Sequence, residues 1–416
     1  MLNPSEASAR ILEDIRPLPA EKANTVDCAG RVLAEDVIAP VTIPPWNNAS
    51  MDGFAVQATD VNGATATNAV ILPVVESIAA GQFPSRSLCA GEAMRIMTGA
   101  PVPEGADSVI RIEDTDGGTH TVAIRDARDG GRNVRPAGED FRQGDVLGGE
   151  GTVVTPTLIG VLLSGGAARI SVYRRPRVAV ISSGDELVTI DKFSEVESGR
   201  RIVSTNSYTL PALVRDAGGD PVDLGIAADT REALREKLEQ ASGCDLIITS
   251  AGISVGDADF TRDVFASLGG KQKFWKVRIR PGAPLAFGQL HGVPWIGLSG
   301  NPVSAVVTFE LFARPAIRKM IGHSRLFRRP LPVDIESDVS IAAELTHFLR
   351  ANVRREGDSY RARLTRSQSS ASLTSLAAAN ALLVVPPEKR SYAAGTRMFA
   401  LPLADYPFEL EQLTLA

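Results

Sequence analysis

The chain has 416 residues, of which 44% are hydrophobic and 22% are charged, and its formal net charge is -5. This length exceeds what one hydrophobic core usually serves, so we expect several domains. The charge balance gives no overall attraction to nucleic acid or to an anionic membrane surface, and we therefore expect neither as a partner.

The three cysteines, Cys28, Cys89 and Cys244, lie far apart and form no C-x-x-C pattern. They predict neither a disulfide framework nor a zinc site. The first residues have mixed charge without the apolar core of a signal peptide, and no apolar run reaches the length of a membrane-spanning helix. These features favour a cytoplasmic protein.

The first half of the chain predicts one short helix followed by β structure. Residues 5–16 have the pattern of an amphipathic helix, which Pro17 and Pro19 stop. From about residue 70 to residue 147, short apolar segments separated by Gly, Pro and Asp predict an antiparallel β domain. A second helix follows, because a Thr-Pro pair at 155–156 and Gly165 supply an N-cap, a first-turn proline and a C-terminal glycine.

From Pro176 onward, apolar strand-like runs alternate with amphipathic helical segments. This alternation predicts a doubly wound, mostly parallel sheet. The expected strands are 177–184, 221–227, 245–249 and 293–298, and the expected helices are 204–218, 230–241 and a long one over about 301–321. After Pro330 short strands return, with a hairpin turn at 356–358, and predict a small C-terminal β domain.

The expected fold class is therefore multidomain, with α/β and β parts. It combines a doubly wound, mostly parallel α/β domain, an inserted β domain, a small helical linker domain and a C-terminal domain of the β-barrel type. The expected boundaries are 1–43 with 142–175 for the linker domain, 44–141 for the inserted domain, 176–326 for the α/β domain and 327–416 for the C-terminal domain.

Two acidic loops follow predicted strands of the α/β domain. Asp185 and Glu186 follow the first strand, and Asp257 and Asp259 follow the strand at 245–249. Ligands of open α/β sheets bind at the carboxyl ends of the strands, so these carboxylates are expected to converge. Converging carboxylates raise one another's pKa, and bound Mg²⁺ relieves that repulsion with oxygen ligands alone. The alternative for Asp259 is a simple helix N-cap.

A second group of motifs near the same crevice suits an anion. Gly300, Asn301 and Pro302 predict a helix start, capped by the Asn301 side chain, whose free N–H groups can receive an anion. An ordinary capped helix is the alternative reading.

The segment KQKFWKVRIRPG, residues 271–282, is strongly basic. Alternation predicts that Lys276, Arg278 and Arg280 share one face of a strand, where they would hold a phosphate or an oxyanion. A solvated basic face is the alternative. Neither G-x-G-x-x-G nor G-x-x-x-x-G-K-S/T is present, which disfavours a dinucleotide-dependent dehydrogenase and a P-loop kinase.

Seven motifs along the chain belong together. They are NASMDGFAV (48–56), IMTGAPVPEGAD (96–107), RPAGED (135–140), SSGDEL (182–187), GISVGDADF (252–260), FWKVRIRPG (274–282) and GNPVSA (300–305). With these motifs the chain resembles the molybdopterin molybdenumtransferase family, also called MoeA, which is related to the C-terminal domain of gephyrin. The likeness runs from near the N-terminus to about Phe399.

The resemblance implies an elongated homodimer of four-domain subunits. The α/β domain, of the molybdopterin-binding type, would face the MDG-bearing β domain of the other subunit, with the active site between them. The implied reaction binds adenylylated molybdopterin with Mg²⁺, takes in molybdate, releases AMP by hydrolysis and leaves molybdenum on the dithiolene. Other proteins of molybdenum cofactor synthesis are further expected partners.

The family motifs also imply roles for individual residues. The residues expected to act in catalysis are Asp52, Asp140, Glu186 and Asp259. The metal ligands expected from the acidic loops and the motifs together are Glu186, Asp257 and Asp259. The residues expected to bind the substrate are Gly252, Lys276, Arg280, Gly300, Asn301 and Pro302, and those expected in the molybdate pocket are Pro284, Ser304, Arg350 and Ser370.

Four positions depart from the family pattern within these motifs or beside them. Ser204, Ala251, Ala283 and Ser299 stand where the family usually has aspartate, glycine, lysine and proline. Ala283 has the largest expected effect, because one lost charge-assisted hydrogen bond costs about 1.5–3 kcal/mol. Two alternatives to the transferase therefore stay open: a non-catalytic molybdopterin-binding or scaffold relative, and a nucleotide pyrophosphatase. A binding protein has no need for the four acidic residues, which favours the transferase.

Overall fold

The computed structural model describes residues 1–251, 261–342 and 344–403. These residues form two compact units. Unit 1 comprises Met1–Glu21, Gly30–Ala34 and the described part of Ser171–Ala416, and unit 2 comprises Lys22–Ala29 and Glu35–Ile170. The chain passes from unit 1 to unit 2 within β1 (Ala20–Asn24), returns to unit 1 for Gly30–Ala34, and passes back to unit 1 for the last time within β11 (Arg169–Tyr173). In the described ranges, no helix combines the length and the apolar character needed to cross a membrane.

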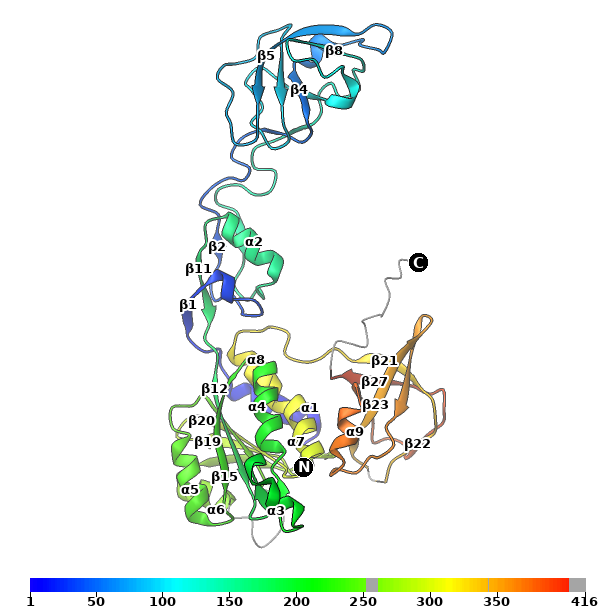
Figure 1. Ribbon diagram of the computed structural model, residues 1–416. Coiled ribbons are helices and arrows are strands. Elements are labelled where there is room, and N and C mark those ends of the chain that lie inside the picture. Colours follow the sequence, from blue (N-terminus) through cyan, green and yellow to red (C-terminus); the bar gives the residue numbers. More distant parts are fainter. Residues whose placement is uncertain (252–260, 343, 404–416) are drawn as a thin grey trace. The chain divides into compact units, whose positions relative to one another are not determined.

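A six-stranded sheet in the order β15-β12-β16-β20-β19-β17 is the centre of unit 1 (Figure 1). Its first four strands are parallel, and β19 and β17 run antiparallel to their neighbours. The expected doubly wound, mostly parallel sheet is confirmed. The strands are β12 (Arg177–Ser183), β15 (Asp220–Ala227), β16 (Leu246–Ser250), β17 (Lys271–Trp275), β19 (Ala286–Leu290) and β20 (Val293–Leu298).

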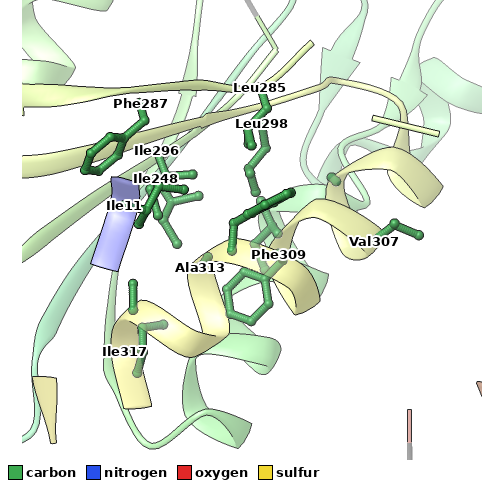
Figure 2. Packing of buried hydrophobic residues seen from close by; sticks show 14 of the residues in the cluster. Ile11, Ile248, Leu285, Phe287, Ile296, Leu298, Val307, Phe309, Ala313 and Ile317 are labelled. Carbon is green, nitrogen blue, oxygen red and sulfur yellow. The ribbon is translucent and has the colours of Figure 1, made fainter. Parts of the chain in front are cut away.

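Helices cover both faces of this sheet, because successive strand side chains point to opposite sides. Val178 and Val180 of β12 pack under α1, α4, α7 and α8, whereas Ala179 and Ile181 pack under α5 and α6. Figure 2 shows the first core, where Ile11 of α1 lies near the helical run that contains Phe309. The helices are α1 (Pro4–Asp14), α4 (Asn206–Asp216), α5 (Arg231–Gln240), α6 (Thr261–Ser267), α7 (Pro302–Thr308) and α8 (Arg314–Met320).

The long helix expected over 301–321 is interrupted. A π-helical segment, Phe309–Ala313, separates α7 from α8. Pro315 has no N–H to donate to a carbonyl one turn earlier, which gives a local reason for the wider turn. Both Phe309 and Phe312 within the π segment are buried in the core, so the wide turn is packed rather than exposed.

The C-terminal part of unit 1 is a closed five-stranded barrel, as expected for this region. The strands pair in the ring β23-β24-β21-β27-β25, and β25 pairs back onto β23. Gly357 and Asp358 form the hairpin between β23 and β24. The strands are β21 (Leu331–Ile335), β23 (Thr346–Glu356), β24 (Ser359–Leu364), β25 (Ala381–Val385) and β27 (Arg397–Pro402), with α9 (Leu373–Ala377) between β24 and β25.

Unit 2 contains a five-stranded sheet in the order β7-β4-β6-β5-β8. The expected antiparallel pairing holds for three of its four neighbouring pairs, but β5 and β6 are parallel, since the segment 79–92 carries the chain back before β6 begins. The strands are β4 (Gly53–Val56), β5 (Val70–Ile78), β6 (Ala93–Ile96), β7 (Ser108–Arg111) and β8 (Thr121–Ile124).

Shorter elements complete unit 2. The strands β2 (Val37–Ile38) and β10 (Val146–Gly148) form one pair, and β3 (Asn48–Ala49) and β9 (Val134–Arg135) form another. The predicted caps of α2 (Pro156–Ser164) are confirmed, because the Thr155 side chain accepts from the Leu158 amide and Gly165 is the C-cap.

Two glycines of unit 2 give a matched test of the packing of the β4–β7 pair. A Cβ atom at Gly53 would lie 1.9 Å from the Ile110 carbonyl oxygen on β7, so Gly53→Ala forces the two strands apart. We expect a loss of about 2–3 kcal/mol in the free energy of unfolding, measured with urea. Gly160 is exposed within α2, and a Cβ atom there would have no neighbouring atom within 4 Å, so Gly160→Ala should instead gain about 0.5–1 kcal/mol. Equal stability of the two variants would contradict the strand packing.

Candidate functional site

A cleft of about 810 Å³ opens at the carboxyl ends of β12, β16 and β20 in unit 1. β15 pairs with β12 on one side and β16 pairs with it on the other. The connection after β12 and the connection after β16 therefore leave the sheet in opposite directions. This is the usual position of a ligand site in an open α/β sheet. The cleft is lined by residues from the segments 182–187, 202–206, 250–251, 279–284, 299–304, 345 and 370–371.

Charge is scarce among the described residues that line this cleft. Of these, Glu186 and Arg280 are the two that carry a charge, and neither makes an ion pair within the described part of the chain. The Glu186 carboxylate folds back toward Gly184, where a Cβ atom would lie 2.8 Å from one of its oxygens. Hydroxyl groups are abundant instead, because seven serines and one threonine line the cleft. The cleft therefore offers mainly neutral hydrogen-bonding groups.

The first acidic loop, which carries Asp185 and Glu186, lies within the described residues. Glu186 lines the cleft, whereas Asp185 turns toward the loop after β15, where its Oδ1 accepts from the Asp229 amide at 3.0 Å and its own amide donates to Asp229 Oδ2 at 3.3 Å. This pairing of two loops holds Asp185 outside the described lining of the cleft. Gly252, Asp257 and Asp259 lie outside the described residues.

The basic segment does not form one strand face. β17 ends at Trp275, Lys276 has a positive φ of 75°, and the next strand, β18 (Ile279–Arg280), pairs with β23 of the barrel rather than with the α/β sheet. The left-handed backbone at Lys276 breaks the alternation on which the prediction depended. Lys276 Nζ lies 4.4 Å from the Trp275 ring centroid. Of Lys276 and Arg280, only Arg280 lines the cleft.

The barrel positions Arg280 through strand pairing. In the β18–β23 ladder Arg280 lies opposite His347, and Ile279 lies opposite Thr346. Burial lowers the pKa of His347, and the positive charge of Arg280 lowers it further, against a hydrogen bond with the Leu345 carbonyl. His347 therefore favours its neutral form beside the cationic group of the cleft.

The start of α7 is held by the barrel, and not by its own cap residue. The Asn301 side chain makes no capping hydrogen bond, so the predicted side-chain cap is wrong. The Val303 amide instead donates to the Ser370 carbonyl at 3.2 Å. Ser304, on the same turn, is only 3% exposed, and a Cβ atom on Gly282 would lie 3.5 Å from its carbonyl oxygen. The segments carrying Gly282, Ser304 and Ser370 therefore meet at this turn.

Arg350 supports the loop that carries Ser370. Its side chain is buried and is not part of the cleft lining, and its Nη2 donates to the carbonyls of Ser367 and Ser369 at 3.1 and 3.0 Å. Its Nε donates to Ser375 Oγ at 3.3 Å. Burial lowers the pKa of Arg350, although the group stays charged because arginine is so strongly basic.

All four departures from the family pattern, Ser204, Ala251, Ala283 and Ser299, line the cleft. Ala251 has a positive φ of 84°, a backbone conformation that favours glycine. Ala283 lines the cleft beside Pro284 and brings no side-chain cation.

The beginning of α4 contributes a polar network that the sequence reasoning missed. Ser204 and Ser207 share a hydrogen bond of 2.6 Å between their hydroxyls, and Ser207 donates to Ser182 at the end of β12. The Asn206 amide nitrogen donates to Ser250 Oγ at 2.6 Å and to the Gly300 carbonyl at 2.8 Å. The signal available in the sequence was a polar residue at the start of a helix that follows a strand. Ser204 was named for its departure from the family pattern, whereas Asn206 and Ser207 were not named.

Asp52 and Asp140 belong to unit 2, whereas the cleft belongs to unit 1. Asp52 is exposed, and its Oδ1 accepts from both the amide and the hydroxyl of Thr98, each at 2.7 Å. These two hydrogen bonds hold the pKa of Asp52 below its usual value. Asp140 is also exposed, and its amide donates to the Ile43 carbonyl at 3.2 Å.

Three family models match successive parts of the chain. Residues 2–166 match the MoeA N-terminal region (domain I and II), residues 179–319 match a probable molybdopterin binding domain, and residues 333–403 match the MoeA C-terminal region (domain IV).

Known proteins match over most of the chain. Molybdopterin molybdenumtransferase 2 of Mycobacterium tuberculosis H37Rv is 39% identical over 378 residues, which cover 89% of this chain and 91% of that protein. Molybdopterin molybdenumtransferase of Haemophilus influenzae is 38% identical over 342 residues, 79% of this chain and 80% of that protein. The crystal structure of the molybdopterin biosynthesis moeA protein from Pyrococcus horikoshii OT3 is 28% identical, with a TM-score of 0.82, and the match covers 97% of this chain and 100% of that one. The resemblance predicted from the motifs is confirmed, and the chain belongs to the MoeA family.

Proposed function

We propose that this protein is a molybdopterin molybdenumtransferase, which inserts molybdate into adenylylated molybdopterin with Mg²⁺-dependent release of AMP. The observation that carries the proposal is the cleft at the ends of β12, β16 and β20, which combines one carboxylate, one guanidinium and many hydroxyls in a chain of the MoeA family. The relatives with this name support the reaction. Phosphoanhydride cleavage needs a carboxylate to hold a metal ion and a cation to stabilise the leaving phosphate. Glu186 suits the first role and Arg280 suits the second.

The binding roles follow from the chemistry of the lining residues. Arg280 makes no ion pair in the described part of the chain, so its guanidinium can pair with a phosphate of the substrate, a geometry in which arginine donates two parallel hydrogen bonds. Ser304 and Ser370 would donate to the tetrahedral molybdate beside Pro284, and Arg350 would hold the Ser370 loop in place. The other residues proposed to bind the substrate are Gly252, Lys276, Gly300, Asn301 and Pro302.

The donor chemistry of the described residues fits Mg²⁺. This ion keeps several waters and is usually held by one or two carboxylates together with substrate phosphates. Glu186 supplies such a carboxylate in the cleft, and no group of three His, Cys, Asp or Glu residues gathers anywhere in the described ranges to form a closed all-protein site. Glu186 would hold the ion with Asp257 and Asp259, and when bound the ion would neutralise charge on the pyrophosphate.

The chemical step proposed here is hydrolysis of the phosphoanhydride. Water attacks the adenylyl phosphorus, the bond to the molybdopterin phosphate breaks, and AMP leaves with the oxygen of that water. Arg280 would stabilise the charge that develops on the phosphates. Asp52 and Asp140 complete the proposed acidic set, and we propose that they act from the second subunit of a cytoplasmic homodimer.

One observation favours a second candidate, a non-catalytic molybdopterin-binding or scaffold protein. Ala283 lines the cleft without a cation, and Lys276 Nζ lies against Trp275, so Arg280 is the one side-chain cation among the described lining residues. A site with little positive charge binds oxyanions weakly. Retention of Glu186 and of the family's acidic residues in unit 2 supports the transferase over this candidate.

AMP release from adenylylated molybdopterin tests the proposed function. We expect release that requires Mg²⁺ and increases with molybdate, and a loss of at least about 100-fold in Glu186→Gln, since that change removes the carboxylate charge and keeps the side-chain shape. Glu195→Gln, an exposed change outside the cleft, is the matched control. Tight substrate binding without release in the wild type would assign the protein to the second candidate.

The effect of Ala283 is testable by adding the missing cation. Ala283→Lys should lower the molybdate concentration for half-maximal AMP release by about tenfold or more, because a charge-assisted hydrogen bond to the oxyanion is gained. Ala283→Met has similar length without charge and should show no such gain. If both variants behave alike, residue 283 is not at the molybdate position.

A further inference from the structure

The loop that carries Ser370 begins where a strand pairing of the barrel ends. β24 pairs with β23 up to Leu364, which lies opposite Ala351, and the Thr365 amide still donates to the Arg350 carbonyl at 3.0 Å. The Arg350 amide then has no residue of β24 opposite it. Arg350 is 1% exposed, and a buried backbone N–H needs a partner.

The side-chain amide of Gln368 takes the place of the missing strand residue. Its Oε1 accepts from the Arg350 amide at 2.9 Å, and its Nε2 donates to the Arg350 carbonyl at 2.9 Å. Nε2 also lies 3.1 Å from Thr365 Oγ1. Exchanging oxygen and nitrogen would oppose two donors at the Arg350 amide and two acceptors at its carbonyl, so the orientation of the Gln368 amide is fixed. One side chain therefore holds both backbone groups of Arg350, as a neighbouring strand would.

The residues on either side of Gln368 are tied to Arg350 as well. The guanidinium of Arg350 donates to the carbonyls of Ser367 and Ser369, at 3.1 and 3.0 Å. Three consecutive residues are thus bound to one buried residue, through both its backbone and its side chain. Ser370 comes directly after this bound segment and lines the cleft.

Ser370 passes this constraint on to α7. Its carbonyl accepts from the Val303 amide at 3.2 Å. Val303 lies in the first turn of α7, where an amide has no partner within the helix. The start of α7 and the cleft side of Ser370 therefore depend on the segment that Gln368 fastens. Gln368 itself is not among the lining residues and can act only through its neighbours.

We infer that Gln368 is a positioning residue of the cleft, which fixes Ser370 and the start of α7 by pairing with the backbone of Arg350. The inference rests on the proposed function for the ligand at Ser370, a tetrahedral oxyanion. The placement of the loop depends on the hydrogen bonds alone, so the two parts are tested separately.

Hydrogen exchange of the Val303 amide tests the placement of the loop. Gln368→Met keeps the side-chain length and removes every hydrogen bond of the amide, so the Ser370 carbonyl should loosen and the Val303 amide of the full chain should exchange about tenfold faster or more. The Ala305 amide donates to the Asn301 carbonyl within the same turn and should exchange as in the wild type. Nuclear magnetic resonance of protein labelled with ¹⁵N in valine and alanine measures both rates.

Calorimetric titration with inorganic molybdate tests the consequence for the ligand. Gln368→Met should weaken molybdate binding by about tenfold, because the hydroxyl of Ser370 is no longer held in one place. In the AMP-release assay the molybdate concentration for half-maximal rate should rise by the same factor, whereas the maximal rate should change less than twofold.

Three further variants separate positioning from a general loss of stability. Thr365→Val removes the hydroxyl that contacts Gln368 Nε2 and the Ser367 carbonyl, and should shift both measurements in the same direction by a smaller factor. Gln289→Met makes the same chemical change at a half-buried residue of β19, opposite Pro294, and should shift neither. Val353→Ala opens space in the barrel core and should lower the unfolding temperature without changing the exchange of Val303 or the affinity for molybdate.

Unchanged exchange of Val303 in both Gln368→Met and Thr365→Val overturns the inference, as does an equal effect of Val353→Ala on exchange and affinity. Faster exchange without any change in molybdate affinity would refute the oxyanion at Ser370 and leave the positioning of the loop standing. A protein that releases no AMP but shows the expected exchange and affinity shifts would refute the transferase alone.

Discussion

The site in unit 1 depends on one constraint of topology, the reversal of the strand order at β12. Because β15 and β16 flank β12 on opposite sides, the loops that leave β12 and β16 cannot cover the strand ends between them. Both faces of the sheet are filled by apolar side chains under helices, so polar groups can gather only at the ends of the strands. Ser182 and Glu186 therefore meet Ser250 in one cleft, although Ser250 is far from both in the sequence.

The barrel is part of this site and not an appendage to it. It supplies the strand partner that fixes Arg280 and the carbonyl that caps the start of α7. The buried Arg350 has no carboxylate partner in the described residues, and loop carbonyls satisfy it instead. Removing a buried cation from water costs several kcal/mol, which charge-assisted hydrogen bonds of about 1.5–3 kcal/mol each offset. The Ser370 loop is consequently held by a charge that is costly to displace.

Local chemistry made part of this structure predictable. The bounds of β20 and the caps of α2 follow from an apolar run and from Thr155, Pro156 and Gly165, all of which act on near neighbours. The errors have long-range causes. Lys276 leaves the strand because β18 pairs with the barrel, and Asn301 needs no side-chain cap because Ser370 provides one.

The candidate site was predictable to a similar extent. Motifs identified Glu186, Arg280, Ser304 and Ser370 as residues of one site, and the cleft contains all four. The burial of Arg350 depends on the closed barrel, which no local pattern encodes. Asn206 was missed because its role depends on Ser250 and Gly300, which approach it only in the folded sheet.

The composition of the cleft also limits how it can recognise a substrate. Among the described lining residues, one carboxylate and one guanidinium stand beside seven serines and one threonine, so most of the polar side chains that can contact a substrate there are neutral. Discrimination must then come from directed hydrogen bonds, which gain strength where water is excluded and which penalise a ligand that leaves a buried group unpaired. Hydroxyl groups can rotate to serve either as donor or as acceptor and thus tolerate several oxyanions. The planar guanidinium of Arg280 donates in a fixed geometry, so it orients a phosphate more strictly than the hydroxyl groups do.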